Sequence, residues 1–208
     1  MAKPASGGAG GSGGRGRAGS ARRNYREYNG AESDALIRAT WNSQNSSSRL
    51  ALEDYQGGPW INSVLRENPE LASTSRAIRH IAALDGSMRP LDEDTILHRG
   101  TVLPGINKIV NRLGMDGAIG QVINDKGYIS TSYDRAVGDE FRKIYSGKNL
   151  ALLRIRAPKG TKGAVASPDF EAYAYQREVV LARNTGLKII SIQKNAAGYY
   201  DIEAEAVQ

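Results

Sequence analysis

Two polar side chains stand out in an apolar strand near the C-terminus. In YAYQREVVL, Gln176 and Glu178 lie two residues apart, in a segment otherwise rich in Val and Leu. Side chains alternate between the two faces of a strand, so these two are expected on one face, roughly 7 Å apart. A carboxylate is charged and accepts hydrogen bonds, whereas an amide donates and accepts them. A glutamate in a β-strand most often faces water, so the pair alone leaves open what this face of the strand borders.

Two earlier segments place polar groups at the ends of apolar strands. LHRG carries Arg99, and GYISTSY carries Ser130, Thr131 and Ser132. A guanidinium offers a planar fork of donors and keeps its charge, which suits it to phosphate or carboxylate groups. Taken singly, each segment has an ordinary explanation, such as a solvated strand end or a turn. Their order along the chain makes them candidates for one site.

The elements that must position these groups are of two kinds. Residues 31–85 show helical spacing, most clearly at 68–86, where Asn68 can cap, Pro69 fits the first turn and Gly86 can end the helix. From Thr95 onward, strands are expected, with helices near 105–113 and 134–146. The strand candidates are 95–102, 120–125, 127–133, 149–157, 162–166, 175–182, 187–194 and 199–207.

The order of these elements predicts the fold class. The strands are not separated by regular crossover helices, which argues against a doubly wound parallel sheet. The expected class is α+β, with N-terminal helices packed on a mixed, largely antiparallel β-sandwich core.

Composition divides the chain into a tail and one domain. Residues 1–24 are Gly, Ala, Ser and Arg with no large apolar side chain after Met1, so a disordered tail is expected. Residues 25–208 suit a single domain. Residues 1–30 carry six basic residues and one acidic, which places +5 of the net charge of +6 there. The tail is either a flexible linker or an arm that binds RNA, DNA or an acidic surface.

Several classes of protein and site are not expected. The chain has no Cys, which excludes a disulfide scaffold and a thiol nucleophile, and its two widely separated His give no metal-ligand spacing. No apolar run reaches membrane-spanning length, and the N-terminus lacks the apolar core of a signal peptide. Metal and membrane partners are therefore not predicted.

Taken in order, the polar segments resemble the mono-ADP-ribosyltransferases of the Arg–Ser–Glu class, which includes clostridial-type toxins and bacteriophage enzymes. The matching residues are His98-Arg99-Gly100, the GYISTS of 127–132, and Gln176-Arg177-Glu178. YQGGPWINSVLREN also resembles the family's Tyr-containing helical segment, which ends in Ile-Asn-x-x-Leu-Arg. The resemblance covers about residues 50–206. It implies an ADP-ribosyltransferase-like fold and an enzyme for which NAD is a substrate, without a metal.

The resemblance also implies roles for single residues. Glu178 would stabilise the positive charge that grows on the ribose as nicotinamide leaves, Ser130 would orient Glu178, and Gln176 would meet the acceptor. The NAD-binding residues would be Arg99, Gly100, Ser130, Thr131, Ser132 and Tyr55. The loop SPDFEAYAY would face the acceptor through Phe170, Tyr173 and Tyr175, or these rings simply pack. His98, which precedes Arg99 on the opposite face, is expected to pack.

A toxin, effector or phage enzyme with a macromolecular acceptor in a target or host cell is implied. The acceptor would be a host protein, with nucleic acid as an alternative. In the family, Gln at the position of Gln176 points away from arginine as acceptor, and toward Asn or Gln side chains or guanine. An NAD glycohydrolase, in which water replaces the acceptor, would use the same residues. A binding module or virion component without activity is the alternative from another class, and it would be expected to lose Arg99 or Glu178.

Overall fold

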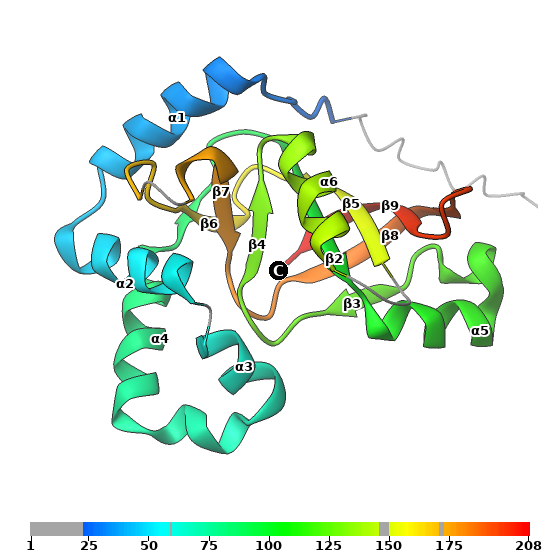
Figure 1. Cartoon of the computed structure of the whole chain (residues 1–208), viewed down its shortest axis with the longest axis horizontal. Helices are drawn as coiled ribbons and strands as arrows, with labels where there is room; N and C mark the ends of the chain where they lie inside the picture. The colour runs from blue at the N-terminus through cyan, green and yellow to red at the C-terminus, as the bar shows by residue number, and fades with distance from the viewer. Residues whose placement is uncertain (1–22, 59, 146–149, 171–172) are drawn as a thin grey trace, which may run out of the picture.

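The N-terminal part of the protein is helical. The computed structural model describes residues 23–58, 60–145, 150–170 and 173–208, so the expected disordered tail lies almost wholly outside the described residues. The helices of this part lie together at one side of the molecule (Figure 1). They are α1 (Gly30–Asn42), α2 (Ser46–Gly57), α3 (Trp60–Glu67), the 3₁₀ turn η1 (Pro69–Ser73) and α4 (Ser75–Ser87). Asn29 and Asn45 cap α1 and α2 by accepting backbone N–H bonds.

The expected helix over 68–86 is wrong in its first turn. Asn68 makes no side-chain capping bond, and Pro69–Ser73 forms the 3₁₀ turn η1 instead. The α-helix begins at Ser75, because Thr74 Oγ1 accepts the backbone N–H of Ala77 at 3.3 Å. The chain therefore changes direction before α4, and the apolar spacing expected across 68–86 is interrupted.

The strands form one curled sheet within the described ranges. Its order is β1-β6-β7-β4-β2-β5-β9-β8-β3, and every neighbouring pair is antiparallel except β5 and β9. The mixed, largely antiparallel α+β class is confirmed. The strands are β1 (Arg89–Pro90), β2 (Thr95–Val102), β3 (Val122–Asn124), β4 (Ile129–Ser132), β5 (Leu150–Ala157), β6 (Lys162–Val165), β7 (Glu178–Leu181), β8 (Gly186–Lys194) and β9 (Tyr200–Val207).

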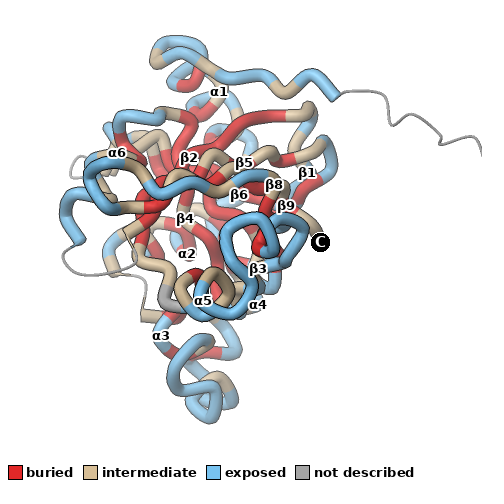
Figure 2. The backbone as a smooth tube through the Cα atoms, turned by 90° about the vertical axis from the view of Figure 1, so that its right-hand side faces the viewer, coloured by how far each residue is buried: buried red, intermediate tan, exposed pale blue. Residues whose placement is uncertain are grey.

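The core lies where the central strands meet the helices. The red segments of Figure 2 are concentrated in the central strands, and the outer helical turns are pale blue. Every residue of β7 is buried, whereas β9 alternates between buried and half-buried residues. A residue on β7 is therefore shielded from solvent whichever face its side chain occupies, which makes a charged side chain there costly.

Two further helices, α5 (Pro104–Ala118) and α6 (Arg135–Ile144), belong to the C-terminal part. Helix α6 packs across β2 at a point where only glycine fits. A Cβ atom added at Gly100 would lie 1.9 Å from the carbonyl oxygen of Gly138 and 2.3 Å from the backbone nitrogen of Arg142. Gly100 therefore lets the backbone of α6 approach β2 directly, and one wall of the site described below depends on it.

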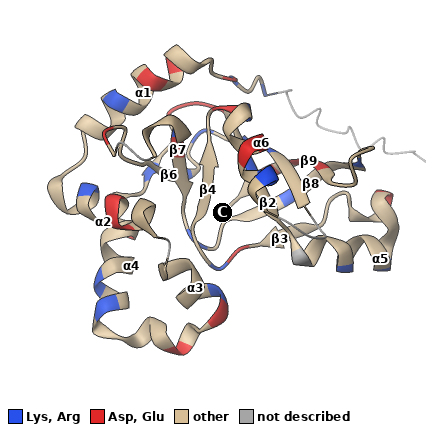
Figure 3. Cartoon of the chain, in the orientation of Figure 1, with Lys and Arg blue, Asp and Glu red and all other residues tan. Residues whose placement is uncertain are grey.

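Charged residues of both signs are distributed over the helices in the view of Figure 3. Over the described ranges, no helix is long and apolar enough to cross a membrane. In the same ranges, no group of three or more His, Asp or Glu residues comes close enough together to hold a metal ion.

Candidate active site

A cavity of about 340 Å³ opens between α2, α6 and the strands β2, β4 and β7. It brings together nine of the eleven site residues that the sequence predicts. Phe170 and Tyr175 do not line it. The nine are Tyr55, Arg99, Gly100, Ser130, Thr131, Ser132, Tyr173, Gln176 and Glu178.

Strand pairing explains why residues so far apart in the sequence meet. Strands β7, β4 and β2 are neighbours in the sheet. Ser132 of β4 lies opposite Glu178 of β7 on one side and opposite His98 of β2 on the other. The three polar motifs therefore lie side by side on three adjacent strands, although 79 positions separate Arg99 from Glu178 in the chain.

Glu178 is a buried carboxyl group at the first position of β7, with 9% of its surface exposed. Burial raises its pKa above the ordinary value of 4.5, while hydrogen bonds from the side chains of Ser130 and Gln56 and the charge of Arg99 act in the opposite direction. A carboxylate in a dry site interacts strongly with any positive charge that develops beside it. This is the chemistry that the sequence resemblance implies for Glu178.

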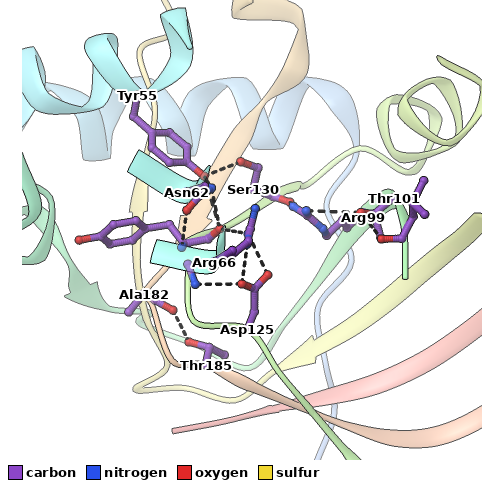
Figure 4. A network of polar contacts seen from close by, with 12 residues as sticks. Tyr55, Asn62, Arg66, Arg99, Thr101, Asp125, Ser130, Ala182 and Thr185 are labelled. Carbon is purple, nitrogen blue, oxygen red and sulfur yellow. Dashed lines mark hydrogen bonds and ion pairs between the residues drawn. The ribbon is translucent and has the colours of Figure 1, made fainter. Parts of the chain in front are cut away.

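A chain of hydrogen bonds from Asn62 through Tyr55 ends at Ser130 (Figure 4). The side-chain amide of Asn62 donates to the Tyr55 hydroxyl at 2.8 Å, and that hydroxyl lies 2.9 Å from Ser130 Oγ. Either oxygen can be the donor in this contact, and the Tyr55 hydroxyl also lies 3.5 Å from the Tyr128 carbonyl as an acceptor. When Tyr55 donates to Ser130, the Ser130 proton is free for the hydrogen bond to Glu178. Burial, followed by the charge of Glu178, raises the pKa of Tyr55 to about 12, so its proton stays in place.

Asn62 also fixes the strand that carries the serine. Its Oδ1 accepts the backbone N–H of Tyr128 at 2.8 Å, and its Nδ2 donates to the Tyr128 carbonyl at 3.1 Å. Arg66, one turn further along α3, donates to the same carbonyl at 2.9 Å and forms a two-point pair with Asp125. Helix α3 thereby holds the entry to β4 in register.

Arg99 presents its guanidinium to the cavity from β2. Its Nη1 donates to the Ser130 carbonyl at 2.5 Å, and its Nη2 lies 3.5 Å from Thr101 Oγ1. No ion pair joins it to a carboxylate in the described part of the chain. Burial lowers the pKa of Arg99, but a guanidinium remains protonated at neutral pH. It therefore carries a positive charge at the cavity wall.

Thr131 and Ser132 hold the neighbouring backbone. Thr131 Oγ1 donates to the Val179 carbonyl at 2.6 Å, and Ser132 Oγ donates to the Gln176 carbonyl at 2.6 Å. Ser132 Oγ also accepts the backbone N–H of Asp134 at 2.9 Å. Both hydroxyl groups have protein partners: Thr131 is bonded to β7 itself, and Ser132 is bonded to the turn that precedes Glu178.

The expected strand geometry of Gln176 is wrong. Gln176 ends a 3₁₀ turn, η2 (Ala174–Gln176), and Arg177 has a left-handed backbone with φ 45° and ψ 46°. Strand β7 therefore starts at Glu178, and simple alternation does not relate the two side chains. Both nevertheless line the cavity, because the turn brings Gln176 to its rim.

The aromatic residues of the preceding loop occupy different environments. Tyr173 lines the cavity, and its ring lies 5.2 Å from that of the half-buried Phe170. Tyr175 is 52% exposed. Residues 171–172, within the predicted acceptor-facing loop, lie outside the described residues. His98 is buried as expected, with Nε2 3.0 Å from Glu27 Oε1, although it also borders the cavity.

Sequence reasoning assigned no role to several residues that the structure brings to the site. Asn62 and Arg66 belong to the Ile-Asn-x-x-Leu-Arg segment, so the resemblance contained a signal for them. Gln56, Phe141 and Tyr145 also line the cavity. Gln56 lies in the segment that carries the resemblance, whereas no sequence pattern marked Phe141 or Tyr145.

Replacing Asn62 with leucine is expected to lower the free energy of unfolding by about 2–3 kcal/mol. The substitution leaves buried polar groups of Tyr55 and Tyr128 without their partner, and each such group costs about 1–3 kcal/mol. Urea denaturation of the variant and the wild-type protein measures the difference. A change below about 0.5 kcal/mol, the range of neutral surface substitutions, would contradict the role of Asn62 as the centre of this network.

Comparisons with known proteins agree with the geometry. The family model described as ADP-ribosyltransferase exoenzyme matches residues 28–207. A search of curated proteins gives no match. Three similar solved structures are an ADP-ribosyltransferase from Clostridium botulinum, the C3 exoenzyme of Clostridium limosum, and a protein from S. aureus crystallised with NAD.

The structural likeness extends over nearly the whole of each chain. For the C. botulinum enzyme the identity is 21%, the TM-score 0.70, and the coverage 89% of this chain and 100% of that one. For the C. limosum enzyme the identity is 23% and the TM-score 0.69, with coverage of 89% of this chain and 98% of that one. For the S. aureus protein the identity is 17% and the TM-score 0.68, with coverage of 88% of this chain and 99% of that one. At such identities the likeness shows the fold, while the family model covers most of the chain. The protein belongs to the ADP-ribosyltransferase exoenzyme family and is an NAD-dependent ADP-ribosyltransferase.

Proposed function

We propose that the protein transfers ADP-ribose from NAD to a side-chain amide of a host protein. This proposal rests on the position of Glu178, a buried carboxyl group that lines the same cavity as Arg99 and Ser130. The S. aureus relative was crystallised with NAD, which supports NAD as a ligand of this fold.

The chemistry follows from the groups present. Arg99 binds the diphosphate of NAD, because a guanidinium fork matches phosphate oxygens. The bond between nicotinamide and ribose breaks, and its electron pair leaves with nicotinamide. The ribose then carries positive charge, which Glu178 stabilises while Ser130 keeps the carboxylate in place. The acceptor nitrogen forms a bond to the ribose carbon and loses a proton.

The polarity of the cavity wall favours a neutral acceptor. Among the described residues that line the cavity, Glu178 is the sole carboxylic acid, and it is assigned to the ribose. The group at its rim is the neutral amide of Gln176. An arginine acceptor would require a second carboxylate for its guanidinium. A side-chain amide can instead exchange hydrogen bonds with Gln176, which both donates and accepts.

Replacing Gln176 with glutamate is expected to reduce transfer to the native acceptor roughly 10-fold, equivalent to about 1.4 kcal/mol. The change removes the N–H donors of the amide and adds a charge near Glu178. NAD hydrolysis is expected to fall less, because Glu178, Ser130 and Arg99 stay in place. Parallel assays of acceptor labelling and nicotinamide release measure the two rates. An equal loss of both would exclude Gln176 from acceptor recognition.

Incubation with NAD labelled in its adenylate phosphate, together with a eukaryotic cell lysate, tests the proposal. Label is expected in material that protease degrades and nuclease leaves intact. Nuclease-sensitive label would instead identify nucleic acid as the acceptor. Nicotinamide release without any labelled macromolecule would show that the protein is an NAD glycohydrolase, which uses water in place of the acceptor.

A further inference from the structure

The middle residue of the Gln-Arg-Glu tripeptide has an unusual backbone. Arg177 adopts the left-handed region, with φ 45° and ψ 46°. Among the described residues, the other non-glycine residue with positive φ is Asn184, a type that tolerates this region. Arginine has no such preference, so the conformation is stable only because the surroundings enforce it.

The guanidinium of Arg177 supplies that enforcement. Its Nε donates to Asp34 Oδ1 at 2.7 Å, and its Nη2 donates to Asp34 Oδ2 at 3.2 Å. Its Nη1 donates to Asp134 Oδ2 at 2.9 Å. We call these three residues the Arg177 clamp. The two-point pair with Asp34 fixes the orientation of the planar group as well as its position.

Both carboxylates of the clamp are themselves fixed. Asp34 lies in α1, whose start is held by a capping box between Asn29 and Glu32. A Cβ atom at Gly30 would lie 3.3 Å from Nη2 of Arg177, so the first turn of α1 fits closely against the guanidinium. Asp134 caps α6 by accepting the N–H of Ala136 at 2.8 Å. The clamp thus joins the tripeptide to two helices.

Different contacts hold the two neighbours of Arg177. Glu178 is held by the pairing of β7 with β4 and β6. Gln176 lies in a 3₁₀ turn outside that pairing, and its carbonyl accepts one bond from Ser132. The position of the Gln176 side chain therefore depends on the turn, and the turn depends on the conformation of Arg177.

We infer that Arg177 is a positioning residue that determines how efficiently ADP-ribose reaches the acceptor rather than water. This inference rests on the proposed function, because it assigns acceptor contact to Gln176 and NAD cleavage to Glu178. The clamp holds Gln176 at the rim in the geometry for the acceptor, and α1 takes part in acceptor selection through Asp34. Cleavage of NAD relies on Glu178, Ser130 and Arg99, none of which contacts the clamp through its side chain.

The experiment compares three variants with the wild-type protein. Asp34→Ala removes the two-point pair from a helix that does not line the cavity. Arg177→Lys keeps the charge but loses the fork. Arg183→Ala is the matched control, because Arg183 makes a two-point pair with Asp85 beyond the other end of β7. Each protein is incubated with labelled NAD and the same eukaryotic lysate, and both nicotinamide release and protein labelling are measured.

The ratio of labelling to nicotinamide release is expected to fall roughly 10-fold in Asp34→Ala and Arg177→Lys, the scale of a small misplacement of a reacting group. Arg183→Ala should keep the wild-type ratio. An unchanged ratio in the two clamp variants, or an equal fall in the control, would overturn the inference while leaving the proposed function intact. A wild-type protein that labels no protein would overturn the proposed function and the inference with it.

Hydrogen exchange provides a readout that is independent of activity. The amides of residues 174–177 should exchange faster in Asp34→Ala than in the wild-type protein, whereas those of 178–181 should keep their protection. Equal protection of 174–177 in the two proteins would show that the turn does not need the clamp, and would overturn the inference.

Discussion

Replacing Glu178 with glutamine is expected to lower the rate of nicotinamide release from NAD at least about 100-fold, the scale of removing one preorganised transition-state group. Glutamine has nearly the same shape, so the cavity and the bonds from Ser130 and Gln56 can largely persist. The lost quantity is the negative charge beside the ribose, which matters most in the transition state. Steady-state assays of nicotinamide release measure the effect.

The variant is also expected to be at least as stable as the wild-type protein. Because burial raises the pKa of Glu178 above 4.5, the folded protein holds this proton at a pH where the unfolded chain has released it. The free energy of unfolding therefore decreases as the pH rises from 4.5 through the raised pKa of the folded state. Glutamine has no proton to release, so the variant does not undergo this decrease. Thermal unfolding at neutral pH is the control. Near wild-type turnover in a folded variant would indicate that another carboxylate acts on the ribose.

The same pKa shift gives a pH dependence for the wild-type enzyme. Only the ionised form of Glu178 stabilises the ribose cation, so kcat/KM for NAD should fall as the pH drops through the raised pKa. The decrease of kcat/KM on the acid side should be centred above pH 4.5, the ordinary pKa of glutamate. The residual activity of Glu178→Gln should not show this decrease.

Replacing Arg99 with lysine is expected to lower kcat/KM for NAD roughly 10- to 100-fold, the range for losing a charged hydrogen bond of about 1.5–3 kcal/mol. Lysine retains the charge but cannot bind two phosphate oxygens with a planar fork. Because the diphosphate does not react, most of the effect should appear in KM rather than kcat. Initial-rate kinetics over a range of NAD concentrations separate the two constants.

Arg183→Lys is the matched control for this prediction, since Arg183 pairs with Asp85 and does not line the cavity. Its kinetic constants should equal those of the wild-type protein. A large fall in kcat with unchanged KM for Arg99→Lys would place Arg99 at the reacting ribose instead of the diphosphate.

Much of the sheet was predictable because local patterns determine where strands lie. The run TILHRGTV matches β2 over 95–102, and the alternation in YYDIEAEAV matches the one-sided burial of β9. Such patterns depend on side chains close together in sequence, and the final packing did not override them.

Local patterns failed where groups far away in the sequence determine the backbone conformation. The alternation expected for Gln176 and Glu178 ignored the turn at Arg177, which Asp34 stabilises from 143 positions away. The start of α4 was misplaced because Asn68 and Pro69 match a capping pattern as well as Thr74 does. In both cases the sequence allowed two conformations, and tertiary contacts selected one.

The sequence predicted most of the residues that form the site, but not how their side chains are arranged. The order of Arg99, Ser130 and Glu178 carried the resemblance to the family, and the pairing of β4 with both β2 and β7 brings them together. The contribution of Asn62 could not be derived from pattern alone. Its effect arises from three hydrogen bonds in the folded state, made to Tyr55 and Tyr128.

The most direct measurement is a crystal structure of the Glu178→Gln variant with NAD. We expect the diphosphate against the Arg99 guanidinium, and the amide at position 178 about 3 Å from a hydroxyl of the nicotinamide ribose. A bound NAD whose nicotinamide ribose lies outside the cavity, with position 178 in contact with no part of the sugar, would contradict the assignment of Glu178.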